Sequence, residues 1–126
     1  MEQDAIEKAI NDKAKEWVEE YDAEFLVELI DVYLDDTPKR LDNLCAALAG
    51  GDLETLTREA HTLKSSSANV GAMSISAIAK EIEAAGRQGD VASVGDKARR
   101  IQADFQLVKS ALEAARKAAA QTIEEL

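Results

Sequence analysis

Residues that interrupt helices are scarce in this chain of 126 residues, which contains one proline and six glycines. Aromatic residues make up only 4% of the sequence, whereas alanine, glutamate, leucine and lysine are abundant. These four are strong helix formers, so the composition is typical of a helical protein with short loops. No alternation of apolar and polar residues indicates a β-strand, and no linker divides the chain. We therefore treat residues 1–126 as one helical domain.

Apolar residues recur every three or four positions in five segments, which predicts five amphipathic helices. The first lies at about residues 4–21 and has the weakest pattern. The second spans about residues 23–48, and Asp22 can cap its start. Pro38 lies within this second segment and removes one main-chain hydrogen bond. We expect a kink there, or a helix that ends and restarts, rather than a wide loop.

Glycines and aspartates separate the later helices, since glycine ends helices and aspartate caps them. The proposed breaks and caps are Gly50 to Asp52, Gly71, Gly86 to Gly89, and Asp90. The fourth helix should begin at about Ser74, and the fifth carries an apolar stripe as far as Ala115. Residues 116–126 are expected to be helical or frayed.

The short connections between these helices favour antiparallel neighbours. We expect an all-α fold: an up-down antiparallel four-helix bundle made of the second to fifth helices. An additional short N-terminal helix, within residues 1–21, should lie across one end. Packing inside the chain accounts for the apolar stripe of the last helix, so we expect a monomer.

Charge and composition exclude several functions. The 15 lysines and arginines against 25 aspartates and glutamates give a net charge of −10, which argues against binding nucleic acid or an anionic membrane surface. One cysteine and one histidine exclude a disulfide within the chain and sites rich in those ligands, so we expect no metal or cofactor. The acidic side chains should lie at solvated helical positions. No segment resembles a membrane span or a signal peptide, so a cytoplasmic protein is expected.

The single histidine, His61, is predicted to face solvent. At 100° per residue, it points about 130° away from the apolar stripe of its helix. Residues one or two turns away share its face. They are Thr57, Arg58, Lys64, Ser65 and Ala68. The imidazole is thus flanked by cations and by small side chains that leave room for another protein.

An exposed imidazole is a nucleophile near neutral pH, and a phosphoryl group on its ring nitrogen would add close to two negative charges. Lys64, one turn away, could offset that charge. No glycine-rich nucleotide loop is present, so the phosphoryl donor would have to be another protein.

The run around this histidine, residues 60–72 (AHTLKSSSANVGA), resembles the signature of histidine-containing phosphotransfer (HPt) domains. The resemblance extends over about residues 23–112. It includes the segment 25–48, the turn at residues 51–53, and the segment 82–90 (IEAAGRQGD). Many family members have glycine four residues after the histidine, where this chain has Ser65, which is still small.

The resemblance implies a four-helix bundle that has no kinase or hydrolase activity of its own. Its histidine accepts a phosphoryl group from the aspartate of one receiver domain and passes it to another receiver, of a response regulator or a hybrid histidine kinase. On this chain, His61 would be phosphorylated on Nε2, Lys64 would stabilise the phosphoryl charge, and Glu83 would orient the imidazole. Gly71 would form a structural turn, and any Mg²⁺ would be held by the receiver alone. The Met1 start and the acidic end favour a free-standing protein over a domain of a hybrid kinase.

Two other functions are compatible with the residues alone. The bundle could be an interaction module that docks a receiver or kinase domain without transferring phosphate. A helical enzyme has less support, because no second acid, base or nucleophile can be paired with His61. The serines at 65–67 lack the strand–turn–helix context that exposes a nucleophilic serine.

Overall fold

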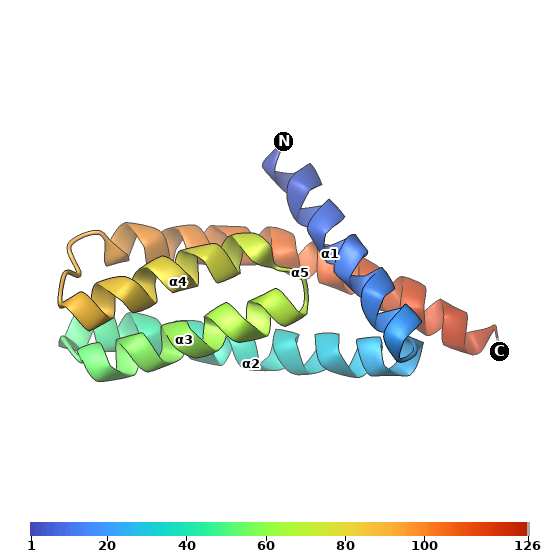
Figure 1. Ribbon diagram of the computed structural model, residues 1–126, viewed down its shortest axis with the longest axis horizontal. Helices are drawn as coiled ribbons and strands as arrows, with labels where there is room; N and C mark the ends of the chain where they lie inside the picture. Colours follow the sequence, from blue (N-terminus) through green and yellow to red (C-terminus); the bar gives the residue numbers. More distant parts are fainter. Residues whose placement is uncertain (126) are drawn as a thin grey trace.

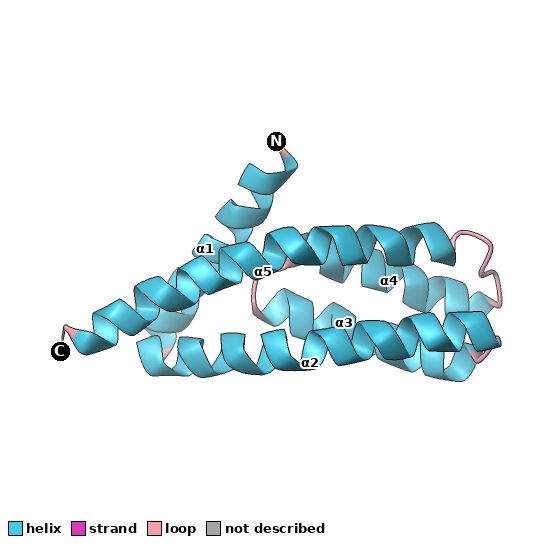
Figure 2. Cartoon of the chain, turned by 180° about the vertical axis from the view of Figure 1, so that it is seen from behind, coloured by secondary structure: helices cyan, strands magenta, loops and turns pink. Residues whose placement is uncertain are grey.

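The structure of the protein is a computed structural model, and it describes residues 1–125. It consists of five helices, and no strand occurs within those residues. Their bounds are α1 Glu2–Glu20, α2 Ala23–Gly50, α3 Leu53–Asn69, α4 Met73–Gln88 and α5 Val94–Glu124. Short loops join them (Figure 2). The all-α prediction is therefore confirmed.

Helices α2 to α5 form the bundle, and successive helices run in opposite directions (Figure 1). Each bundle helix packs against two others, in the cyclic order α2, α3, α4, α5. Helices α2 and α5 have 28 and 31 residues, against 17 and 16 in α3 and α4. The long pair therefore extends beyond the short pair at one end of the molecule (Figure 1).

Helix α1 crosses that extended end and packs against α5 and α2 (Figure 1). It buries Ile6 and Ile10 in the hydrophobic core. The position agrees with the sequence-based expectation. With 19 residues, α1 is shorter than α2 and α5, although it is not shorter than α3 or α4.

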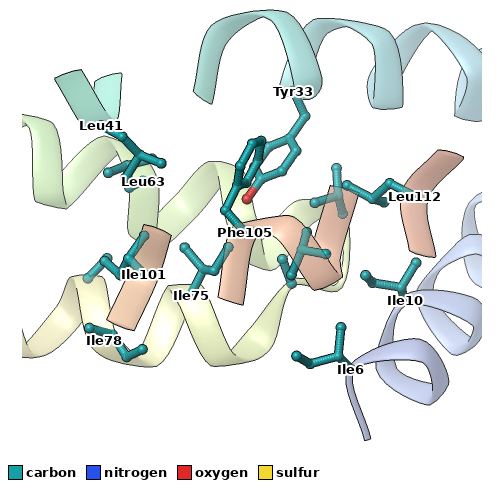
Figure 3. Close-up of a cluster of buried hydrophobic side chains, with 14 of the residues drawn as sticks. Ile6, Ile10, Tyr33, Leu41, Leu63, Ile75, Ile78, Ile101, Phe105 and Leu112 are labelled. Atoms are coloured by element: carbon teal, nitrogen blue, oxygen red, sulfur yellow. The ribbon is translucent and has the colours of Figure 1, made fainter. Parts of the chain in front are cut away.

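The core follows the apolar stripes along the bundle axis. Figure 3 shows Tyr33 of α2 beside Phe105 of α5, with ring centroids 6.3 Å apart. The Tyr33 hydroxyl is hydrogen-bonded to Ser67 Oγ on α3 at 2.8 Å. Ser67 is therefore a small core residue whose polar group is satisfied inside the bundle. This network holds the inner face of α3 and leaves its outer face toward solvent.

Two helix starts agree with the predicted caps, and one does not. Asp22 accepts the main-chain N–H of Phe25 at 2.8 Å, and Asp52 accepts that of Thr55 at 3.1 Å. Asp90 does not cap α5, which begins four residues later. Its main-chain N–H instead donates to the carbonyl oxygen of Ala85, at the end of α4.

The structure decides between the outcomes expected at two interruptions: a restart of the helix at Pro38 is excluded, and the break expected at Gly86 to Gly89 falls at its last residue. Helix α2 does not end and restart at Pro38, which lies inside it. Proline removes a single hydrogen bond there, while buried residues on both sides, Tyr33 and Leu41, hold the two halves against the core. Helix α4 continues through Gly86 to Gln88, and Gly89, in the left-handed conformation, ends it. At the other end of the chain, α5 is helical through Glu124, and residue 126 lies outside the described residues.

The turn after α3 is fixed by α1. Gly71 has φ of +83°, a conformation that favours glycine. A Cβ atom there would lie 2.8 Å from the carbonyl oxygen of Ala9 and from Cβ of Lys13. The indole N–H of Trp17 donates to the carbonyl oxygen of Asn69 at 2.6 Å. Helix α1 thus anchors the C-terminal end of the histidine-bearing helix.

Candidate functional site

The side chain of His61 lies on the solvent side of α3, with 57% of its surface exposed. Its neighbour Ala60 and the nearby Leu63 are fully buried and hold the helix against the core. The predicted outward direction of His61 is therefore confirmed. The backbone is rigidly packed while the ring remains accessible.

Glu83 of α4 holds the ring from the inner side. Its side chain is only 7% exposed, and His61 Nδ1 lies 2.7 Å from Oε2. Lys64 Nζ donates to Oε1 at 2.7 Å, and Arg87 Nη2 donates to Oε2 at 2.8 Å. The structure thus brings together three residues that the sequence singled out separately or only by resemblance: His61, Lys64 and Glu83. Arg87 joins them.

These donors keep Glu83 ionised. The hydrogen bonds from Lys64 and Arg87, aided by that from His61, lower the pKa of Glu83 from 4.5 to about 2. An ionised carboxylate can only accept hydrogen bonds. The proton of the 2.7 Å contact must therefore be on His61 Nδ1. In the neutral ring, Nε2 then carries the free lone pair.

Arg87 was not identified as a site residue from the sequence. It lies four residues after Glu83 on α4, the spacing at which a carboxylate and a cation meet on one helix face. That spacing is visible in the sequence and was the available signal. The spacing alone does not place Arg87 at the site, because the sequence does not show that Glu83 faces His61.

The other residues predicted on this face surround His61 in different ways. A groove of about 400 Å³ beside the ring is lined by Leu53, Glu54, Thr57, Arg58, His61, Gly86 and Arg87. Arg58 and Ser65 are exposed, and Ala68 is half-buried. Thr57 is also half-buried, and its hydroxyl donates to the carbonyl oxygen of Leu53 at 2.7 Å. Thr57 also lies against Gly86 of α4, so it faces α4 in part rather than solvent alone.

A hydrogen bond between helices also fixes α4 beside α3. The hydroxyl of Ser76 donates to the carbonyl oxygen of Lys64 at 2.7 Å. This bond lies beyond the Glu83 contacts along the same pair of helices. The histidine and its carboxylate partner are consequently presented by two helices that are tied together.

The expectation that the acidic residues lie at solvated positions is wrong for Glu59, Glu83 and Asp104, which are buried. Glu59 is compensated by Arg40, at 3.1 Å, and Glu83 by its own cationic partners. Burial of a carboxylate is tolerated when such partners are in reach. In the part of the chain that the structure describes, no group of three or more His, Cys, Asp or Glu residues is placed to hold a metal ion. No helix there is long and apolar enough to cross a membrane.

Comparison with known proteins agrees with this geometry. The model of the Hpt domain family matches residues 28–124, so the chain belongs to the Hpt domain family. It is a histidine phosphotransfer relay intermediate of two-component systems, and it interacts with receiver domains of phosphorelay proteins. Proteins of this class are phosphoryl carriers and generally not enzymes.

Among solved structures, the chain is similar to histidine-containing phosphotransfer protein B (HptB) from Pseudomonas aeruginosa PAO1. The two share 28% sequence identity, with a TM-score of 0.78. The match covers 83% of this chain and 90% of the other. A search of curated proteins found no match. These findings give no support to the alternative of an interaction module that transfers no phosphate.

Proposed function

We propose that His61 is the phosphoryl-accepting residue and that it reacts through Nε2. The lone pair of Nε2 forms the nitrogen–phosphorus bond as the bond between phosphorus and the receiver's aspartate oxygen breaks. The aspartate leaves as a carboxylate with that electron pair. The ring becomes cationic, because Nδ1 retains its proton. The ionised Glu83 beside Nδ1 stabilises this charge and fixes the ring orientation.

The phosphoryl group brings close to two negative charges to the surface of α3. Lys64 is the cation that we assign to stabilise it, from one turn away on the same helix. In the unphosphorylated structure, its ammonium group is hydrogen-bonded to Glu83. The ammonium group of Lys64 can turn from Glu83 toward the phosphoryl group, because Arg87 still donates a hydrogen bond to Glu83.

Thr57, Arg58, Ser65 and Ala68 are assigned to contact the receiver domain. They share the outer face of α3 with His61, where small side chains leave the ring open to a docking protein. Ser65 occupies the place of the glycine found in many relatives, and as an exposed, small residue it keeps that approach open.

The remaining assignments concern enzymatic activity, cofactors, oligomeric state, location and binding partners. We propose that it has no kinase or hydrolase activity and needs no cofactor, with Mg²⁺ held by the receiver's carboxylates. We also propose a cytoplasmic monomer that binds neither nucleic acid nor membrane. The net charge of −10 and the lack of a glycine-rich nucleotide loop support these assignments.

The exposed ring held through Nδ1 by a buried carboxylate is the observation that supports the role of His61. The test is incubation with a phosphorylated receiver domain, followed by a time course of acid-labile phosphate on this chain. Wild-type protein should become labelled, and His61→Gln should not. Labelling of the His61→Gln variant would contradict the assignment. Receiver binding without any capture of phosphate would favour the interaction module instead.

A further inference from the structure

Gly86 of α4 packs directly against Thr57 of α3 beside the site. Gly86 is buried, although it lies within a helix where alanine would be more favourable. A Cβ atom on Gly86 would overlap Oγ1 of Thr57. Real Cβ atoms essentially never come within 3.0 Å of such an atom, so any other residue here requires the neighbour to move.

The side chain of Thr57 has little freedom to move. Its hydroxyl donates to the carbonyl oxygen of Leu53 at 2.7 Å, so rotating it away from Gly86 would break that bond. Threonine is also branched at Cβ, which restricts the rotamers available to it in a helix. A larger residue at position 86 would therefore push α3 and α4 apart at this turn.

This contact lies one turn from the histidine and its partner. Thr57 precedes His61 by four residues on α3, and Gly86 follows Glu83 by three residues on α4. The two helices run side by side in opposite directions (Figure 1), so the pairs face each other on adjacent turns. The bond between His61 Nδ1 and Glu83 Oε2 is 2.7 Å long, and hydrogen bonds weaken steeply as their length and angle depart from the optimum.

We propose that Gly86 is a positioning residue for phosphotransfer: its missing side chain lets α4 approach Thr57 closely enough for Glu83 to hold the imidazole of His61. This proposal rests on the proposed role of His61 and Glu83. It explains why a residue that is unfavourable in a helix is kept at a buried position one turn from the site. Neither a break in α4 nor a positive φ angle accounts for it, because Gly86 has neither.

The test compares Gly86→Ala with the matched control Gly95→Ala, whose new Cβ would meet nothing closer than Arg99 Nη1 at 3.8 Å. Two quantities are measured: the rate of phosphoryl transfer from a phosphorylated receiver, and the ¹⁵N and ¹H spectrum of the His61 imidazole. Gly86→Ala should lower the transfer rate roughly tenfold or more, since small misplacements of reacting groups have effects of this size. It should also weaken the signal of the Nδ1–H proton. Gly95→Ala should change neither quantity.

A double variant distinguishes an effect on the position of Glu83 and His61 from a general loss of structure. Thr57→Ala removes the atom that a Cβ at position 86 would strike. The effect of Gly86→Ala should therefore be much smaller in the Thr57→Ala background than in the wild type. If Gly86→Ala alone does not fold, the double variant should fold and show the wild-type imidazole spectrum. A double variant with a disturbed spectrum would overturn the proposal.

Two results for the single variant would also overturn it. One is a folded Gly86→Ala protein with an unchanged imidazole spectrum, whatever its transfer rate. The other is an altered spectrum with full transfer. The spectrum is recorded without a receiver, so it tests the positioning even if His61 accepted no phosphate. Failure of the proposed function would instead appear as transfer that survives His61→Gln.

Discussion

Glu83 Oε2 lies 2.7 Å from His61 Nδ1, although 22 residues and the turn between two helices separate them in the sequence. The contact places a buried, ionised carboxylate behind an exposed imidazole. It therefore fixes both the direction of the ring and the nitrogen that carries the proton. The reactive properties of the single histidine depend on the packing of α4 against α3.

Replacing Glu83 should slow phosphotransfer without removing it. A hydrogen bond to a charged group contributes about 1.5–3 kcal/mol, which corresponds to roughly a ten- to hundredfold change in rate if it is lost in the transition state. We expect a decrease of that size for Glu83→Ala in a timed transfer assay from a phosphorylated receiver. Glu81→Ala, at an exposed position on the same helix, is the matched control. Transfer by Glu83→Ala at the wild-type rate would contradict the orienting role.

The stability of the protein should depend on pH through Glu83. Its pKa falls from 4.5 to about 2 on folding, so the folded state binds this proton less strongly than the unfolded state. The stabilisation is complete above about pH 4.5 and is lost as the pH falls toward 2. Urea unfolding of wild type and Glu83→Gln from pH 7 to 3 measures it. The difference between the two proteins should shrink below pH 4.5, and a constant difference would contradict the prediction.

Lys64→Ala should affect the phosphorylated form rather than the fold. The variant removes the cation that we assign to the phosphoryl group, and a side chain that is half-buried but not in the core. We expect a transfer rate or a lifetime of phosphohistidine lower by roughly tenfold. Thermal unfolding should shift down only in part, because Arg87 and His61 still donate to the buried Glu83 when Lys64 is removed. Lys109→Ala, an exposed lysine on α5, is the control for loss of a positive charge. An equal effect of both variants would contradict a specific role of Lys64.

Substitutions on opposite faces of α3 should separate stability from function. Leu63 is fully buried, so Leu63→Ala should lower the free energy of unfolding by about 2–5 kcal/mol. Ile101→Ala on α5 should do the same for the same reason. His61→Ala should change stability by about 1 kcal/mol or less and abolish transfer. Chemical denaturation provides the measurement. Unfolding of His61→Ala would contradict the outward position of the ring.

Glycine at the turn after α3 should be required both by its backbone angle and by its contact with α1. Gly51 and Gly71 both have positive φ angles, but only Gly71 has neighbours that a Cβ would strike. Gly51→Ala should therefore destabilise the protein by about 1–2 kcal/mol, the cost of the backbone angle. Gly71→Ala should add about 1–3 kcal/mol for overpacking against Ala9 and Lys13. Equal destabilisation of the two variants would show that α1 does not constrain this turn.

Features that depend on one helix at a time could be predicted from the sequence. The outward direction of His61 follows from the helical period, and the caps at Asp22 and Asp52 follow from their position before apolar segments. Glu83 was included only through the family resemblance, because no local pattern places it near a histidine 22 residues earlier.

Features that depend on neighbouring helices were wrong or missed. A restart of α2 at Pro38, one of the two outcomes expected there, did not account for packing on both sides of it, and Asp90 does not cap α5 as expected. Gly86 was interpreted as the first residue of the break at Gly86 to Gly89, although the helix ends only at Gly89 and Gly86 is a point of close contact with Thr57. Local propensity is a weak signal where tertiary contacts compensate for its cost.

The sequence by itself determined the helical fold class, the exposed imidazole and the small side chains around it, because the period of the α-helix relates positions a few residues apart. Only the tertiary structure decided which groups surround that imidazole. The register of α4 against α3 brings Glu83 and Arg87 to His61 and Lys64, and α1 fixes the end of the same helix. That register depends on side-chain packing between helices, which no spacing within a single helix specifies.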